Sequence, residues 1–150
     1  MHHWIKLGLF LKLLLVLHLG FAQKGKYLTV DTTKYIVWSE ERPLTWRDYL
    51  KISSDSIDLG VTALTAVTHS IRGGITKGQP NFQVYVLFKK RNSWTTSRTD
   101  MQLFAHEKLH FDLAELYGRK LRKQIAAMGS QNVTKLSDYR KKIKILLDEF

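Results

Sequence analysis

The spacing of apolar residues changes once along this chain, at about Thr99, and no other feature constrains the fold as strongly. Before that point apolar residues alternate with polar ones, most clearly in Phe82–Lys90, which is typical of a strand. After it, apolar residues recur at helical spacing to about Ala127, and a second, amphipathic helix is predicted over Thr134–Phe150. Strands followed by helices indicate an α+β domain with an antiparallel sheet.

Shorter signals place the other elements and their boundaries. The sequence predicts strands within Tyr27–Trp38, a helical turn over residues 45–50 that buries Trp46, and a loop over residues 51–58. A strand is predicted over Val61–Ile71, followed by turns at Gly73-Gly74 and at residues 77–80. The first helix is expected to begin with a capping box of Thr99 and Gln102 and to end at Gly129-Ser130.

The first 22 residues have the pattern of an export signal. A lysine precedes an apolar run over residues 7–19, and small residues then suit cleavage after Ala22. The alternative is an uncleaved anchor, but the run is shorter than the roughly 20 residues of a spanning helix and contains Lys12. We therefore expect a secreted or periplasmic domain over residues 23–150, with no transmembrane segment after cleavage.

Composition limits how such a domain can be stabilised and what it can bind. The chain has no cysteine, so a single core without disulfides must hold the fold together. The formal net charge of +11 favours anionic surroundings, such as a cell-envelope polymer or a membrane surface. Export and the lack of a recognition motif argue against nucleic acid as the partner.

Residues 106–110 have the form His-Glu-x-x-His and lie in the first predicted helix. Residues four apart on a helix differ by about 40° in direction, so His106 and His110 can bind the same ion. Zinc suits this pair, because it accepts neutral imidazole nitrogens and tolerates an open water position. Glu107 points about 80° away from the histidines, which suits a general base acting on a water molecule.

The third ligand is left open by the sequence. His69 is one candidate, although a histidine in such a segment is more often an ordinary strand residue; Asp138, Tyr139, Asp148 and Glu149 are the others. Asp112 and Glu115 point too far from the histidines to bind the same ion. They could accept hydrogen bonds from the imidazoles, or pair with Lys108 and Arg119 at helical spacing. Tyr117 shares the histidine face about 10 Å along the axis, where it could line a cleft.

The region around the motif resembles a bacterial family of domains of unknown function described as predicted secreted zinc-dependent proteases. The shared features are Ser93-Trp94, the run His106–Asp112, Ala114-Glu115, Arg119 and Leu121, with Arg42–Trp46, Asp48-Tyr49 and Thr62–Thr68 upstream. The similarity covers about residues 35–147, nearly all of the chain after the signal.

The resemblance implies a zincin-like fold and zinc-dependent hydrolysis of peptide or protein substrates. Members often continue past the second helix into a segment with another histidine, whereas this sequence stops at Phe150. If that histidine is the usual third ligand, weak zinc binding or no activity is expected here. The alternative function is a non-enzymatic envelope protein, with a structural or vestigial metal site and basic faces that bind an anionic polymer.

Overall fold

The structure of the chain, a computed structural model, describes residues 29–54 and 61–150. In chain order these residues form β1 (Tyr35–Val37), a single 3-10 turn η1 (Trp46–Asp48), β2 (Leu50–Lys51), β3 (Ala63–Leu64), β4 (Val67–Thr76), β5 (Gln79–Lys89), β6 (Trp94–Thr95), α2 (Met101–Ser130) and α3 (Leu136–Asp148). The predicted α+β layout, with an antiparallel sheet before two helices, is confirmed. The predicted signal lies outside the described residues.

The larger sheet has the strand order β1-β5-β4 and is antiparallel throughout. Its long hairpin turns at Lys77-Gly78, where both residues have positive φ angles of 51° and 75°. Such angles are those of a two-residue hairpin turn, and glycine adopts them without strain. The turn predicted at Gly73-Gly74 is wrong, because both glycines lie inside β4 and pair with Phe82 and Asn81 of β5.

A second small sheet has the order β2-β6-β3, with β2 parallel and β3 antiparallel to β6. The single strand predicted over Val61–Ile71 is therefore two strands, β3 and β4, interrupted at Thr65-Ala66. At the break the Ala66 N–H donates to Ser93 Oγ over 2.9 Å, and the Ala66 carbonyl accepts from the Lys89 N–H over 2.8 Å. These bonds to the end of β5 and to the loop that follows it hold the break in place.

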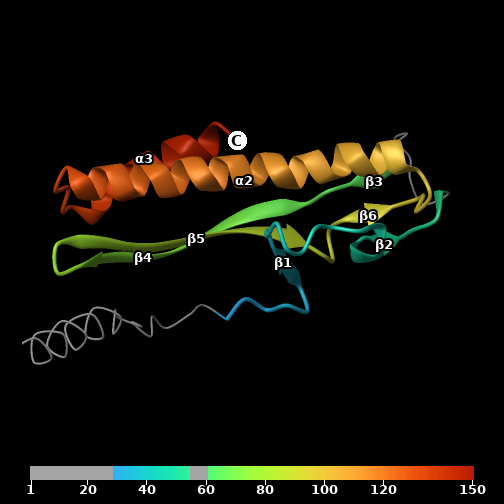
Figure 1. Cartoon of the computed structure of the whole chain (residues 1–150), viewed down its shortest axis with the longest axis horizontal. Coiled ribbons are helices and arrows are strands. Elements are labelled where there is room, and N and C mark those ends of the chain that lie inside the picture. The colour runs from blue at the N-terminus through green and yellow to red at the C-terminus, as the bar shows by residue number, and fades with distance from the viewer. Residues whose placement is uncertain (1–28, 55–60) are drawn as a thin grey trace, which may run out of the picture.

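The helix α2 runs along the strands, and α3 folds back beside its C-terminal half (Figure 1). The N-cap of α2 is Asp100, whose side chain accepts from the Leu103 N–H over 2.8 Å. Asp100 thus replaces the capping box predicted for Thr99 and Gln102. The helix ends at Ser130, which agrees with the end predicted at Gly129-Ser130.

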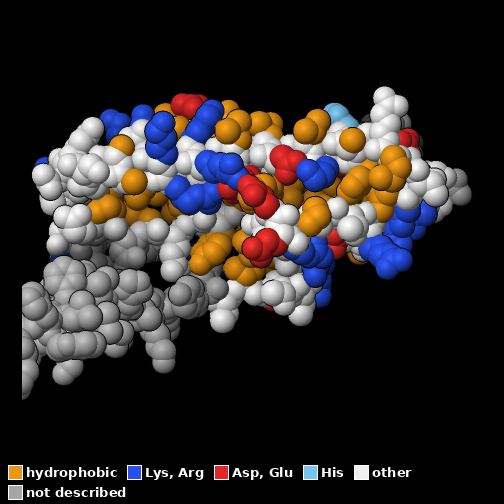
Figure 2. Space-filling model, in the orientation of Figure 1, with side chains coloured by type: hydrophobic (Ala, Val, Ile, Leu, Met, Phe, Trp, Pro, Cys, Tyr) orange, Lys and Arg blue, Asp and Glu red, His pale blue; other side chains and the backbone are white. Residues whose placement is uncertain are grey.

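Two apolar clusters lie between α2 and the strands. One gathers η1, β1 and the end of β5 around Phe88 and Phe111, and contains Trp46, which is 7% exposed as predicted. The other joins Val84 of β5 and Leu121 of α2 to Tyr139 of α3. Apolar side chains also remain at the surface along α2, among lysines and arginines (Figure 2): Met101, Leu109, Leu113 and Leu116. None of the described helices is long and apolar enough to cross a membrane.

Candidate metal centre

The packing of α2 decides how the His-Glu-x-x-His side chains are presented. The buried residues of the helix recur every three or four positions, and Glu107 belongs to this core-facing row with Phe111 and Ala114. His106 and His110 fall on the neighbouring face and are exposed. The register therefore buries the carboxylate at 5% exposure and leaves both imidazoles open to solvent.

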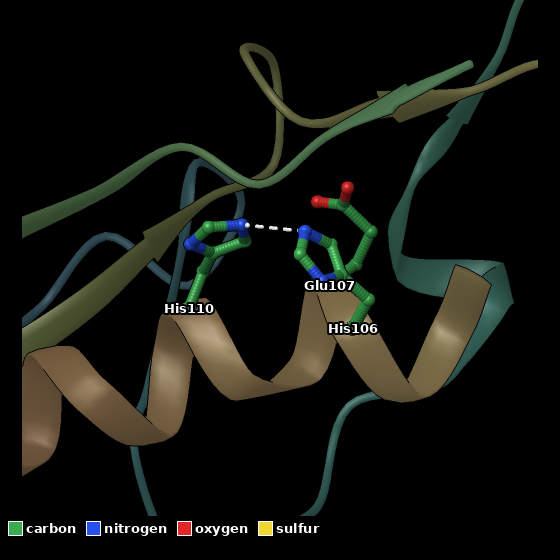
Figure 3. Close-up of side chains that lie close together, drawn as sticks. All are labelled: His106, Glu107 and His110. Atoms are coloured by element: carbon green, nitrogen blue, oxygen red, sulfur yellow. Dashed lines mark hydrogen bonds between the residues drawn. The ribbon is translucent and has the colours of Figure 1, made fainter. Parts of the chain in front are cut away.

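The two imidazoles converge, as the sequence predicted. His106 Nε2 and His110 Nε2 lie 3.3 Å apart, with their rings nearly perpendicular at 88° (Figure 3). One ligand atom from each of His106, Glu107 and His110 falls within 4.8 Å of the others, which is close enough for the three residues to hold one metal ion. Within the described ranges this is the one such group of His, Cys, Asp and Glu side chains.

A hollow of about 370 Å³ opens beside these side chains, between α2 and β3. Its other walls are Leu103 and the five consecutive residues Val61–Thr65. In the small sheet β3 is an edge strand that pairs only with β6, so among the described elements its second edge carries no strand. The candidate metal centre thus lies in an open hollow beside an unpaired strand edge.

Two residues outside the predicted site support the acid of the motif, Thr65 by direct contact and Tyr49 through Thr65. Thr65 Oγ1 donates to Glu107 Oε2 over 2.6 Å, and Tyr49 OH lies 2.8 Å from Thr65 Oγ1. Burial is the main cause that raises the pKa of Tyr49 to about 12; the hydrogen bond with Thr65 opposes the rise and the nearby Glu107 charge adds to it. The sequence signal for each residue was its place in an upstream element of the family resemblance, Asp48-Tyr49 for Tyr49 and Thr62–Thr68 for Thr65.

His69, the predicted third ligand, lies outside the group. It is on β4, where its Nε2 is 2.8 Å from the Ala114 carbonyl and its ring packs edge-on against Phe150. The other candidates are also engaged elsewhere: the Tyr139 hydroxyl donates to the Val133 carbonyl, and Asp148 pairs with Lys144. The side chain of Asp138 accepts from the Ser137 hydroxyl at the start of α3. Glu149, just after α3, presents its carbonyl to Tyr117.

The two acids predicted near the motif pair with cations and do not contact the imidazoles. Asp112 accepts from Lys108 Nζ over 2.7 Å and from Trp38 Nε1 over 3.0 Å. Partial burial opposes ionisation of Asp112, but these two hydrogen bonds outweigh it and lower its pKa. The helical pairing left open by the sequence is therefore found here.

Glu115 is 7% exposed and accepts hydrogen bonds from Arg119 and Arg122. A buried carboxylate needs such partners, because removing it from water is costly. Tyr117 does not line the hollow beside the histidines; its hydroxyl donates to the Glu149 carbonyl over 3.0 Å. Tyr117 therefore joins α2 to the residue that follows α3, whereas the partners of Glu115 lie on α2 itself.

Comparisons with known proteins return no match. No family model matches the chain, and neither the curated proteins nor the solved structures contain one that does. The family resemblance seen in the sequence therefore stays a prediction, and the functional argument depends on the site itself.

Proposed function

We propose that this protein is an exported zinc-dependent peptidase with a zincin-like domain. His106 and His110 hold the metal, and Glu107 is the general base. The observation that carries the proposal is the convergence of two exposed imidazole nitrogens, 3.3 Å apart, beside a buried carboxylate and an open hollow. Export rests on the signal-like pattern of residues 1–22.

Zinc fits the donor set better than other common ions. Two nitrogens at about 2.1 Å from a tetrahedral zinc ion lie roughly 3.4 Å from each other, close to the separation of the two Nε2 atoms. Calcium and magnesium prefer sites built from oxygen ligands, and this group offers two imidazoles. With Glu107 acting as the base, no further His, Cys, Asp or Glu joins the two histidines within the described residues, so we expect a lower affinity than that of a three-ligand site.

Glu107 supplies the proton transfer that peptide hydrolysis needs. Zinc, when bound, would polarise a water molecule and the substrate carbonyl. The Glu107 carboxylate accepts a proton as the water oxygen attacks the carbonyl carbon, and then delivers that proton to the nitrogen of the departing amine. A buried carboxylate held beside an open hollow is well placed for both transfers.

The hollow fits an extended peptide. An unpaired strand edge offers backbone N–H and C=O groups to a substrate, which can add as a further strand. Around the edge of β3 the side chains of Val61 and Leu64 are 44% and 46% exposed. This surface favours substrates with apolar side chains.

A second function is supported by other observations. Two histidines with no further ligand besides the proposed base could mark a structural or vestigial metal site. The helices α2 and α3, with the N-cap of α3, also carry many exposed cations, which are Arg119, Lys120, Arg122, Lys123, Lys135, Arg140, Lys141 and Lys144. A non-enzymatic envelope protein that binds an anionic polymer would use this surface. We rank it second, because polymer binding gives no role to the buried Glu107.

Metal analysis combined with peptide cleavage tests the proposal. We expect the purified protein dialysed against zinc to hold one ion, and His106→Ala to lose it because one of two imidazoles is gone. Glu107→Gln should keep the ion but lower kcat at least about 100-fold, since amide oxygen is a poor base. Glu41→Gln, which changes an exposed glutamate with no acid–cation pair, is the matched control.

Each result has a distinct consequence. A protein that binds no zinc at neutral pH contradicts the proposal outright. Bound zinc without cleavage of a broad peptide library, together with salt-sensitive retention on an anionic polymer, would favour the second function. Cleavage that persists in Glu107→Gln would remove this residue from the mechanism.

A further inference from the structure

We propose that Tyr49 and Thr65 are positioning residues, which hold the Glu107 carboxylate through a hydrogen-bonded chain running from the core to the hollow. This inference rests on the proposed function, because it assigns a role to the neighbours of the proposed base. This hydrogen-bonded chain links three parts of the protein that are far apart in the sequence. They are the residue that follows η1, the break between β3 and β4, and α2.

The direction of the chain follows from the chemistry of its groups. A hydroxyl has a single proton, and Thr65 Oγ1 donates its proton to Glu107 Oε2 over 2.6 Å. Tyr49 must then donate its phenol proton to Thr65 Oγ1 at 2.8 Å. Because burial raises the pKa of Tyr49 to about 12, the phenol keeps that proton at neutral pH.

Both supports are themselves held rigidly. Tyr49 is 1% exposed, and its ring packs at 5.0 Å from the rings of both Trp46 and Phe88. Its backbone carbonyl accepts from Arg98 Nη2 over 2.8 Å. Thr65 precedes Ala66, whose N–H and carbonyl are bound to the end of β5 and to the loop that follows it. The carboxylate is thus connected to the centre of the core.

The hydrogen-bonded chain also gives the two carboxylate oxygens of Glu107 different roles. Oε2 accepts from Thr65, whereas Oε1 has no hydrogen-bond partner among the described residues. Oε1 therefore remains available to accept a proton from a molecule in the hollow. Fixing one oxygen in this way removes the freedom of a three-torsion side chain to rotate away, which would otherwise oppose catalysis.

Thr65→Val removes the hydroxyl while it keeps the size and branching of the side chain. We expect zinc content and KM to be unchanged and kcat to fall about 10- to 100-fold, as misplacing a reacting group does. Thr65→Ser restores the hydroxyl and should recover most of kcat, and Tyr49→Phe should give a smaller loss. A structural role alone would lower thermal stability without this split between kcat and KM.

A second measurement does not depend on turnover. A dipeptide hydroxamate chelates zinc and offers a proton to the neighbouring carboxylate, so calorimetry of its binding reports where that carboxylate lies. Glu107→Gln sets the loss in affinity when the carboxylate is absent, and Thr65→Val should show at least a threefold loss while Thr65→Ser matches the original protein. Glu41→Gln again serves as the control.

The outcomes separate this inference from the proposed function. If Thr65→Val equals the original protein in both kcat and hydroxamate affinity, the inference is overturned and the peptidase stands. If the zinc protein cleaves no peptide but hydroxamate affinity still falls in Thr65→Val, the peptidase fails and the positioning role stands. Loss of zinc in Thr65→Val would assign Thr65 to the metal-binding framework and overturn the inference.

Discussion

Glu107 is a charged side chain in the core-facing row of α2, at 5% exposure. A helix of this kind would gain more stability from an apolar residue there, since burying a carboxylate is costly unless hydrogen bonds compensate. Thr65 supplies one such bond, and the exposed histidines lie on the next face. A stability cost at a position that faces a hollow is typical of residues kept for function.

Asp48 allows a test of stability at the residue scale. It accepts two hydrogen bonds from Arg42, at 2.6 and 3.1 Å, and one from the Thr45 N–H at 2.8 Å. Partial burial opposes its ionisation, but these contacts outweigh burial and lower its pKa below the ordinary 3.8. Asp48→Asn keeps an acceptor for Thr45 and loses the charge, so we expect a loss of about 1 kcal/mol at pH 7.

The pH dependence of that loss has a definite sign. Because the folded pKa is the lower one, the unfolded chain takes up a proton first as the pH falls. The contribution of Asp48 is thus complete above its ordinary pKa of 3.8 and disappears as the pH falls through the folded value. Urea unfolding at several pH values should show Asp48→Asn approaching the original protein below that range; a constant difference would contradict the account.

At the scale of elements, the sequence predicts what depends on periodicity and misses what depends on contacts. The strand Phe82–Lys90 and both helices follow from apolar spacing, and β5, α2 and α3 confirm them. Residues Thr65 and Ala66 look equally strand-like in sequence, and only their bonds to Ser93, Lys89 and Glu107 interrupt the strand. That interruption also brings Thr65 to Glu107, so this part of the site could not be predicted from the sequence.

The contacts of the glycines in α2 could not be predicted for the same reason. Gly129 lies beside the helix end at Ser130, as predicted, but the sequence does not show that a Cβ there would lie 2.6 Å from Cγ of Pro80. The Gly118 position is similar, since a Cβ would meet Val86 Cγ2 at 2.5 Å. These glycines mark close contact between α2 and the β4–β5 hairpin, which periodicity alone does not reveal.

Gly118→Ala tests how firmly α2 is seated on β5. Alanine favours a helix by about 1 kcal/mol over glycine, but here its methyl group must displace Val86. We expect a net loss of about 1–3 kcal/mol in the free energy of unfolding, typical of overpacking. Ala127→Gly, an exposed position on the same helix, measures the propensity term alone. A gain in stability for Gly118→Ala would mean that the helix and strand can separate without cost.

At the scale of the whole molecule, α2 is the element that joins the two sheets to the second helix. It contacts β3, β4, β5 and α3, and it carries both histidines of the metal group. The chain has no cysteine and so no disulfide that would restrict the conformations of its unfolded state. A ligand that binds only the folded form can stabilise the fold instead. The histidine pair is preorganised by the helix and loses this arrangement on unfolding.

Zinc should therefore stabilise the whole domain by mass action. At a free concentration 100 times Kd the gain is about 2.7 kcal/mol, and it should appear as a higher Tm that rises with zinc and reverses with a chelator. His106→Ala and His110→Ala should each abolish the gain. His69→Ala should retain it, because His69 Nε2 already pairs with the Ala114 carbonyl. If His69→Ala also loses the gain, His69 must move to the metal on binding, and among the candidates left open by the sequence it would be the third ligand.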